Sequence, residues 1–276
     1  MANYTTADVK KLRELTAAGM MDCKKALDEN DGDLDKAVDF LRVKGLKGVT
    51  KREGRSATNG LVTAQVDGTS GTLVEINCET DFVAKSENFL KVTSQVLAHV
   101  VAAKPADVDA LLCSEIAAGQ TVQAFLDEAN AMLGEKIELR RFAQYADGFV
   151  AAYLHKTSPD IPAQIGVLIE LDAENAEIAK DIAQHIAAFS PTYLTREEIP
   201  ATIVETERRL AEETSREEGK PEAALPKIVE GRVNGFFKEN VLLEQAFAKD
   251  SKKSVQKVLD EAGVSVKRFA RFRVGN

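Results

Sequence analysis

The sequence predicts an α+β protein, in which helices cover one face of each antiparallel sheet. The first 45 residues carry only short helical patterns, and after residue 58 an order of two strands, two helices and one strand occurs twice. A charged helical stretch interrupts the second copy. The predicted units are a three-helix bundle at 1–45, a basic linker at 46–58, a first core subdomain at 59–146, a second core subdomain at 147–193 and 238–276, and a helical hairpin at 194–237.

The first unit is predicted to contain three small amphipathic helices. Thr5 or Thr6 can cap a first helix with apolar residues at helical spacing. Gly19 separates it from a second helix, and a turn at 30–32 precedes a third that Gly45 is expected to end. Helices this small can bury their apolar faces only against one another, so a bundle follows. The linker shows no periodicity, and its basic residues are Lys44, Lys47, Lys51, Arg52 and Arg55.

An internal repeat is the clearest feature of residues 59–276. Each copy pairs two apolar runs with turn residues between them, which predicts a β-hairpin, followed by helices and a last strand. The matching segments are 59–62 and 73–76 with 147–150 and 168–171, then 87–103 with 174–189, 122–129 with 255–262, and the strands around Arg141 and Arg268. Two copies are too few for a solenoid, so we interpret the repeat as a duplication. It predicts two related subdomains, each a three-stranded antiparallel sheet with helices on one face.

The insertion between Leu194 and Phe237 is predicted to form an antiparallel helical hairpin. Charged helix formers fill its first half, and the segment 219–221, Gly-Lys-Pro, breaks the helix. The second half carries Leu225, Val229, Val233 and Phe236 near a 3.5-residue spacing. Such a narrow apolar stripe suits a coiled-coil seam. Whether the hairpin is a strut, a docking arm or a dimerisation element stays open.

Composition and charge favour a cytoplasmic protein whose partners are other proteins. The formal net charge of −8 weighs against binding to nucleic acid. The N-terminus lacks the apolar segment of a secretion signal, and no run approaches the roughly 18 apolar residues that would span a membrane. The cysteines, Cys23, Cys78 and Cys113, are odd in number and widely spaced. They indicate neither a disulfide framework nor a metal pair, so we expect no metal and no cofactor.

The sequence also lacks the motifs of common enzymes. There is no GxxxxGK[ST] phosphate loop, so direct nucleotide binding of that kind is not expected, and GxSxG and HExxH are absent. Residues 28–39 have some features of a calcium loop, but Gly32 falls at the wrong position and no terminal Glu follows. His99, His155 and His185 are scattered without a nucleophile motif. We therefore expect a protein that is not an enzyme.

Two stretches resemble the elongation factor Ts family. Residues 12–27, LRELTAAGMMDCKKAL, are similar to its N-terminal signature, and residues 75–85, EINCETDFVAK, are similar to its second signature. The likeness continues, in the family's order, through 134–137, around His155 and through 229–232. It implies a UBA-like bundle and guanine-nucleotide exchange on elongation factor Tu during translation elongation. Many relatives continue past the final strand of this sequence, so we expect their C-terminal contact to be missing.

The segment from Thr80 to Val83 is the principal candidate site. From the residues alone, Thr80 or Asp81 caps a helix and Phe82 packs beneath it, because caps of this type are common. The resemblance implies a different role, in which Thr80, Asp81, Phe82 and Val83 enter elongation factor Tu beside its nucleotide-bound Mg²⁺. Phe82 would then fill an apolar slot, and Asp81 would disturb the groups around the metal.

The resemblance also implies weaker contacts with the same partner. These residues are Arg13, Met20, Met21, Leu133, Gly134, His155 and Phe247. Structural alternatives stay open for several of them. At least one of the two methionines is expected in the bundle core, Leu133 and Gly134 can form only the turn before a strand, and a lone histidine such as His155 is more often a solvated or core residue. The competing function is a general adaptor, in which the bundle binds some other peptide and the remainder serves as a scaffold.

Overall fold

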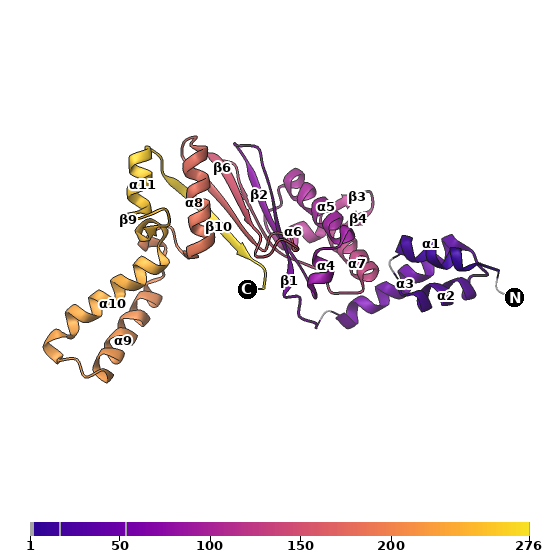
Figure 1. The fold of residues 1–276 in the computed structure, drawn as a ribbon, viewed down its shortest axis with the longest axis horizontal. Helices are drawn as coiled ribbons and strands as arrows, with labels where there is room; N and C mark the ends of the chain where they lie inside the picture. The colour runs from indigo at the N-terminus through magenta and orange to yellow at the C-terminus, as the bar shows by residue number, and fades with distance from the viewer. Residues whose placement is uncertain (1–2, 17, 53, 276) are drawn as a thin grey trace.

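The computed structural model describes residues 3–16, 18–52 and 54–275. The molecule is elongated, with a helical bundle at one end, two sheets with helices on their outer sides in the middle, and a helical hairpin at the other end (Figure 1). The molecule combines helices with antiparallel sheets, so the predicted α+β class is confirmed.

The bundle consists of α1 (Thr6–Thr16), α2 (Met20–Glu29) and α3 (Leu34–Arg52). Thr5 caps α1 reciprocally: its hydroxyl accepts from the backbone N–H of Asp8 at 3.3 Å, and the Asp8 carboxylate accepts from the N–H of Thr5 at 2.7 Å. The buried core residues are Leu12, Cys23, Ala26, Leu27, Ala37 and Leu41. Its helices bury their apolar faces against one another, as their small size requires.

The third helix does not end at Gly45, as the sequence predicted, but continues to Arg52. Gly45 lies against α7 (Val122–Leu133), where a Cβ atom would come within 2.6 Å of the Ala131 Cβ. The Arg52 guanidinium donates to the carbonyl of Asn130 at 3.1 Å. Packing against α7 therefore overrides the helix-breaking tendency of glycine. The side chains of Lys47 and Lys51 lie outside the described residues.

The first sheet has the strand order β1-β2-β5 and is antiparallel throughout. Its elements are β1 (Asn59–Val66), β2 (Gly71–Cys78), α4 (Asp81–Ala84), α5 (Glu87–Ala103), α6 (Val108–Cys113), β3 (Glu115–Ala117), β4 (Gln120–Thr121), α7 and β5 (Glu138–Tyr145). Every residue of β2 is buried, because helices cover one face of the sheet and the second sheet covers the other.

The second sheet repeats this plan, with the order β10-β7-β6. Its elements are β6 (Phe149–His155), β7 (Ile165–Leu171), α8 (Ala176–Phe189), β8 (Ala246–Phe247), β9 (Asp250–Ser254), α11 (Val255–Ala262) and β10 (Val266–Arg273). In both sheets the second strand is central, and a two-stranded ribbon precedes the helix that leads into the last strand. The duplication stays our interpretation of this correspondence.

The two sheets pack face to face through positions that the repeat makes equivalent. A Cβ atom at Gly71 would lie 2.5 Å from Val150 Cγ1, and one at Gly166 would lie 2.3 Å from Val62 Cγ1. Both valines also donate their backbone N–H to a carbonyl of the opposite unit, at 3.0 and 2.8 Å. The two halves therefore contact each other reciprocally, with glycine at the closest approach on each side.

A buried carboxylate in each central strand pairs with an arginine of the last strand. Glu75 accepts from Arg141 Nε at 2.7 Å, and Glu170 accepts from Arg268 Nε at 2.6 Å. The second oxygen of Glu170 accepts from the N–H of Asp147 at 2.6 Å, whereas Glu75 Oε1 has no partner among the described residues. The two pairs are therefore unequal, since an unpaired buried oxygen is costly.

Burial raises the pKa of the Glu75 carboxyl above its ordinary value of 4.5, and the guanidinium of Arg141 offsets only part of this effect. The folded state then binds more protons than the unfolded state just above pH 4.5, so this group lowers stability as pH rises through that window. We expect the free energy of unfolding of Glu75→Gln, relative to that of the original chain, to increase as pH rises. Urea unfolding between about pH 4 and pH 8 measures the difference, and a constant difference would contradict the assignment.

The hairpin pairs α9 (Ala201–Glu217) with α10 (Leu225–Asn240), and Gly219 at φ +71° makes the turn. The buried row of α10 is Leu225, Val229, Val233 and Phe237. Phe236, which the sequence placed in this row, is only half-buried. The row recurs every fourth residue, a spacing typical of globular helix packing, so a coiled coil stays a prediction.

Two glycines in α10 weaken the hairpin without making a close contact. No described atom lies within 4 Å of a Cβ built at Gly231 or Gly235. Alanine at either position is expected to raise the free energy of unfolding by about 0.5–1 kcal/mol, because glycine loses more backbone entropy in a helix. Thermal unfolding checks this, with Gly45→Ala as the control that should destabilise because it meets Ala131. Lower melting temperatures for both hairpin variants would contradict this prediction.

Candidate functional site

The candidate site is an exposed tip between β2 and the single helical turn α4, and we call residues 80–83 the tip. Thr80 is the N-cap of α4, and its hydroxyl accepts from the backbone N–H of Val83 at 3.3 Å. Ala84 is buried and Val83 packs partly against the first core, so the inner side of the turn is occupied. Phe82 therefore points outward and is 73% exposed. The alternative that Phe82 packs beneath the helix is wrong.

Asp81 and Phe82, the exposed residues of the tip, share Lys85 as a neighbour. Lys85 Nζ lies 3.3 Å from a carboxylate oxygen of Asp81 and 4.4 Å from the centre of the Phe82 ring. The positions are three and four residues apart, which puts them on one side of a helical turn. The surface thus presents a carboxylate and a phenyl ring side by side, with one lysine near both.

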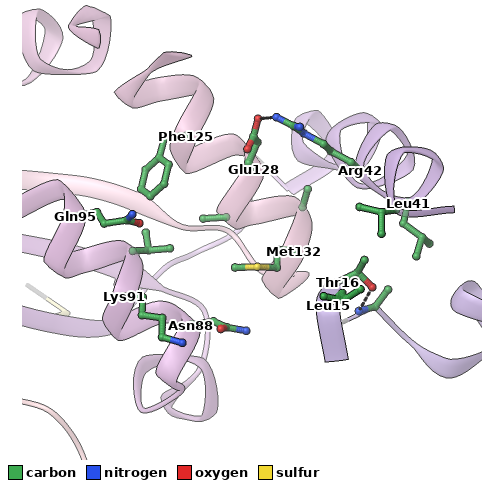
Figure 2. Close-up of a pocket in the computed structure, with 15 residues that line it drawn as sticks. Leu15, Thr16, Leu41, Arg42, Asn88, Lys91, Gln95, Phe125, Glu128 and Met132 are labelled. Carbon is green, nitrogen blue, oxygen red and sulfur yellow. Dashed lines mark hydrogen bonds and ion pairs between the residues drawn. The ribbon is translucent and has the colours of Figure 1, made fainter. Parts of the chain in front are cut away.

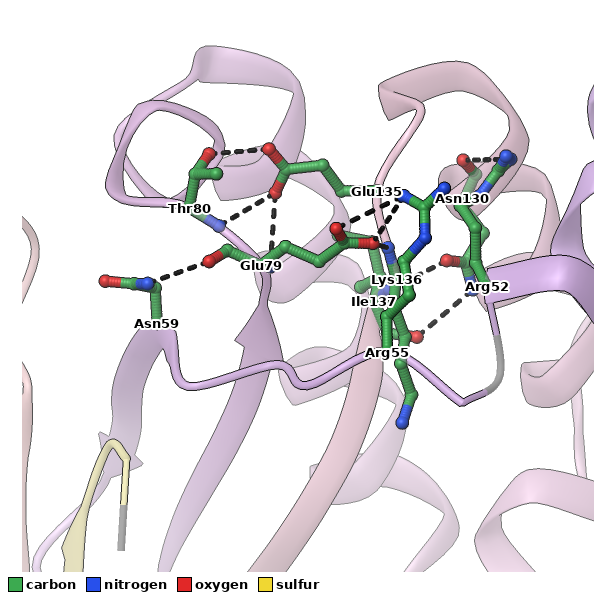
Figure 3. Close-up of polar contacts among 9 residues, drawn as sticks. All are labelled: Arg52, Arg55, Asn59, Glu79, Thr80, Asn130, Glu135, Lys136 and Ile137. Atoms are coloured by element: carbon green, nitrogen blue, oxygen red, sulfur yellow. Dashed lines mark hydrogen bonds and ion pairs between the residues drawn. The ribbon is translucent and has the colours of Figure 1, made fainter.

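Two glutamates tie the base of the tip to the turn before β5 (Figure 3). Glu135 accepts from the backbone N–H groups of Glu79 and Thr80, at 3.1 and 3.0 Å, and from the Thr80 hydroxyl at 2.5 Å. In return, the Glu79 carboxylate accepts from the N–H of Lys136 at 2.7 Å and from Arg55 at 3.3 Å. These residues are far apart in sequence, so sequence reasoning did not find the ties.

The cysteine that precedes the tip has low reactivity. Cys78 is buried, and its thiol donates to the carbonyl of Thr80 at 3.2 Å. Burial, together with nearby carboxylates, raises the pKa of the Cys78 thiol to about 12. The thiolate is the reactive form of cysteine, so this residue supports the tip as a small protonated donor rather than as a nucleophile.

The bundle presents a second apolar surface. Met20 and Met21 are 60% and 76% exposed, so the expectation that at least one of them is buried is wrong. Arg13 is exposed on α1. Leu15 of α1 is also exposed. Exposed apolar residues gathered in this way commonly mark sites of protein–protein contact, and thioethers adapt well to such a role.

A groove of about 420 Å³ lies between the bundle and the helices α5 and α7 (Figure 2). Leu15 lines it from the bundle, and Phe125 and Met132 line it from α7. Arg42 and Glu128 form an ion pair across its rim. Sequence reasoning missed the groove because its walls come from segments that only the tertiary fold brings together.

The remaining predicted residues are dispersed. Leu133 is half-buried at the end of α7, and the exposed Gly134 closes that helix with φ +74°. This turn lies beside the tip, because the next residue is Glu135. His155 is exposed at the end of β6. Phe247 departs from its prediction as a partner-facing residue: it is 5% exposed, because the short strand β8 directs its ring into the second core.

Two further observations concern residues 3–16, 18–52 and 54–275 alone. No group of three or more His, Cys, Asp or Glu side chains in these ranges is arranged to hold a metal ion. In the same part of the chain, no helix is both long enough and apolar enough to cross a membrane.

The fold and the exposed side chains describe an α+β protein with two apolar features suited to contact with another protein: the tip, and the exposed Met20 and Met21 of the bundle. The comparison with known families matches residues 79–276 to the model described as "Elongation factor TS". The chain belongs to the elongation factor Ts family.

Relatives named elongation factor Ts align along the whole chain. The protein of Streptomyces griseus is 69% identical over 277 residues, which cover all of both chains. Those of Thermobifida fusca and Micrococcus luteus are 58% and 60% identical over all of this chain, and cover 99% and 100% of the relatives.

Proposed function

We propose that this chain is a guanine-nucleotide exchange factor that binds elongation factor Tu carrying GDP, displaces its Mg²⁺ and promotes GDP release so that GTP can rebind. The observation that carries the proposal is the 73% exposure of Phe82 on a turn whose base is fixed by hydrogen bonds. A large apolar ring held in water is unfavourable for the free protein, and a partner pocket would remove that cost.

The energy available from the tip suits nucleotide exchange. Burial of a phenylalanine side chain contributes about 1.5–3 kcal/mol, and each tenfold loss in nucleotide affinity needs about 1.4 kcal/mol of coupling. In GTP-binding proteins the Mg²⁺ bridges phosphate oxygens and neutralises their charge. Phe82 would hold the partner's metal site in an altered geometry, and Asp81 would compete for groups around the ion. Thr80 and Val83 would support them, one as the cap and one as the inner anchor of the turn.

The rest of the interface uses surfaces outside the tip. The UBA-like bundle would grip a helix of the partner's nucleotide domain through Arg13, Met20 and Met21. Leu133 with Gly134 would add a contact beside the tip, and His155 one at the second sheet. Phe247 is left out because it is buried.

Under the same proposal, the chain has no catalytic activity and few kinds of partner. It would act in the cytoplasm without being an enzyme, with no cofactor, no nucleotide of its own, and no nucleic acid or membrane as partner. The coiled-coil hairpin would be available for dimerisation.

The direct test is the release of a fluorescent GDP analogue from elongation factor Tu. We expect a substoichiometric amount of this chain to accelerate release, because an exchange factor is free to act again after GTP rebinds. A pull-down should recover nucleotide-free elongation factor Tu as the dominant partner. Unchanged release together with capture of other proteins would instead favour an adaptor.

A further inference from the structure

The tip is held by a side chain from a different part of the chain, and that side chain is Glu135. One carboxylate accepts three hydrogen bonds from the tip and its base: from the N–H of Glu79 at 3.1 Å, from the N–H of Thr80 at 3.0 Å and from the Thr80 hydroxyl at 2.5 Å (Figure 3). Hydrogen bonds to a charged acceptor are the stronger kind, and this set fixes both the backbone and the side chain of the N-cap.

The tie is reciprocal, which makes it stiff. The Glu79 carboxylate accepts from the N–H of Lys136 at 2.7 Å, so each of the two segments sends a glutamate to the backbone of the other. The Glu79 side chain is 20% exposed, and its outer contact is Arg55, which follows the helix α3 of the bundle. The base of the tip is thus bound to the turn before β5, and through Arg55 to the segment between α3 and β1.

The Thr80 hydroxyl connects the hydrogen bonds of Glu135 to the helical turn that carries the Phe82 ring. It donates to Glu135 and at the same time accepts from the N–H of Val83 at 3.3 Å, so it joins Glu135 to the single turn of α4. Phe82 lies inside that turn and has no burial of its own to fix it. Its direction therefore follows the turn, which the Thr80 cap and the packing of Val83 and Ala84 hold, and Glu135 in turn fixes the cap.

We propose that Glu135 is a positioning residue for nucleotide exchange: its three hydrogen bonds hold the tip in the arrangement that enters the partner. This inference rests on the proposed function. Glu135 need not touch the partner, because it acts through Thr80. The complex needs the tip in one arrangement. A mobile tip would therefore bind less favourably, because part of its contact energy would be offset by the entropy lost on ordering.

A matched tie in the second sheet provides the control. Asp172 follows β7 and accepts from the N–H of Ser265 at 2.7 Å and from its hydroxyl at 2.6 Å. Like the tie made by Glu135, this tie joins the end of a central strand to the turn before the last strand of its sheet. It uses one N–H and one hydroxyl, whereas Glu135 accepts from two N–H groups and one hydroxyl. Asp172→Ala removes a comparable structural tie from the half of the core that lacks the tip.

The experiment measures the maximal rate of GDP-analogue release from elongation factor Tu, and separately the affinity for it, with the full chain. Glu135→Ala is expected to lower the maximal rate by about tenfold or more while affinity changes by less than about threefold, because other surfaces hold the partner. Glu135→Gln keeps an acceptor for both N–H groups and should recover most of the rate. Asp172→Ala should keep the rate of the original chain.

Four outcomes overturn the inference. Equal loss of rate in Glu135→Ala and Asp172→Ala would indicate a merely structural role, and a loss of affinity at an unchanged maximal rate would indicate a contact residue. Full activity of Glu135→Ala, with activity lost in Asp81→Ala/Phe82→Ala, would refute the inference and leave the proposed function intact. No acceleration by the original chain would refute both.

Discussion

Replacing Asp81 and Phe82 together by alanine is expected to slow GDP release from elongation factor Tu by about tenfold to a hundredfold relative to the original chain. The range follows from the burial energy of one phenyl ring, about 1.5–3 kcal/mol, realised only when the ring enters the partner. The measurement is stopped-flow release of a fluorescent GDP analogue at saturating concentrations of each variant.

The fold should not change, because both side chains are exposed and neither belongs to a core. The melting temperature of the double variant is therefore expected to match that of the original chain. Phe189→Ala is the control for the loss of an exposed phenyl ring, since Phe189 is 52% exposed at the C-terminal end of α8, where its ring stacks on His185. Equal release rates in the double variant and the control would reject the role of the tip.

Replacing Arg268 by methionine is expected to lower the free energy of unfolding by about 3–5 kcal/mol, because it leaves the carboxylate of Glu170 buried without its cation. Glu170 is fully buried, and the guanidinium also lies 4.5 Å from the centre of the Tyr145 ring in the opposite sheet. The substitution therefore removes an ion pair and a contact between the two sheets. Urea unfolding at neutral pH measures the loss.

A control and a compensating variant separate these effects. Arg273→Met makes the same change of charge at an exposed position of the same strand and should cost little. Arg268→Met combined with Glu170→Leu removes both charges and should recover much of the lost stability, since a buried ion pair is often replaceable by apolar residues. A loss below about 1 kcal/mol in the single variant would show that Glu170 finds another partner.

Periodicity predicted the sheet units well because burial there is decided locally. The helix predicted at 87–103 coincides with α5, and the apolar runs at 73–76 and 168–171 lie inside the central strands. Those strands are buried on both faces, so their sequences are mostly apolar and easy to recognise, with the buried Glu75 and Glu170 as exceptions.

Tertiary contacts decided what periodicity could not. Gly45 is a plausible helix end in isolation, but its lack of a side chain is what lets α3 approach Ala131 closely. The apolar character of Met20 suggested a core that the smaller Cys23 and Ala26 already fill. At the tip, the sequence predicted a cap by Thr80 or Asp81, and the structure has Thr80. The sequence did not predict the tie to Glu135, since no local pattern links residues so far apart.

The central claim is that binding of the tip to elongation factor Tu weakens the affinity of elongation factor Tu for GDP. Coupling between two ligands is reciprocal, so the factor by which this chain weakens GDP binding must equal the factor by which GDP weakens binding of the chain. The decisive measurement is the affinity of the chain for nucleotide-free and for GDP-bound elongation factor Tu, for the original sequence and for Asp81→Ala/Phe82→Ala. We predict much tighter binding to the nucleotide-free form, with most of that preference lost in the double variant; equal affinity of the original chain for both forms would contradict the account.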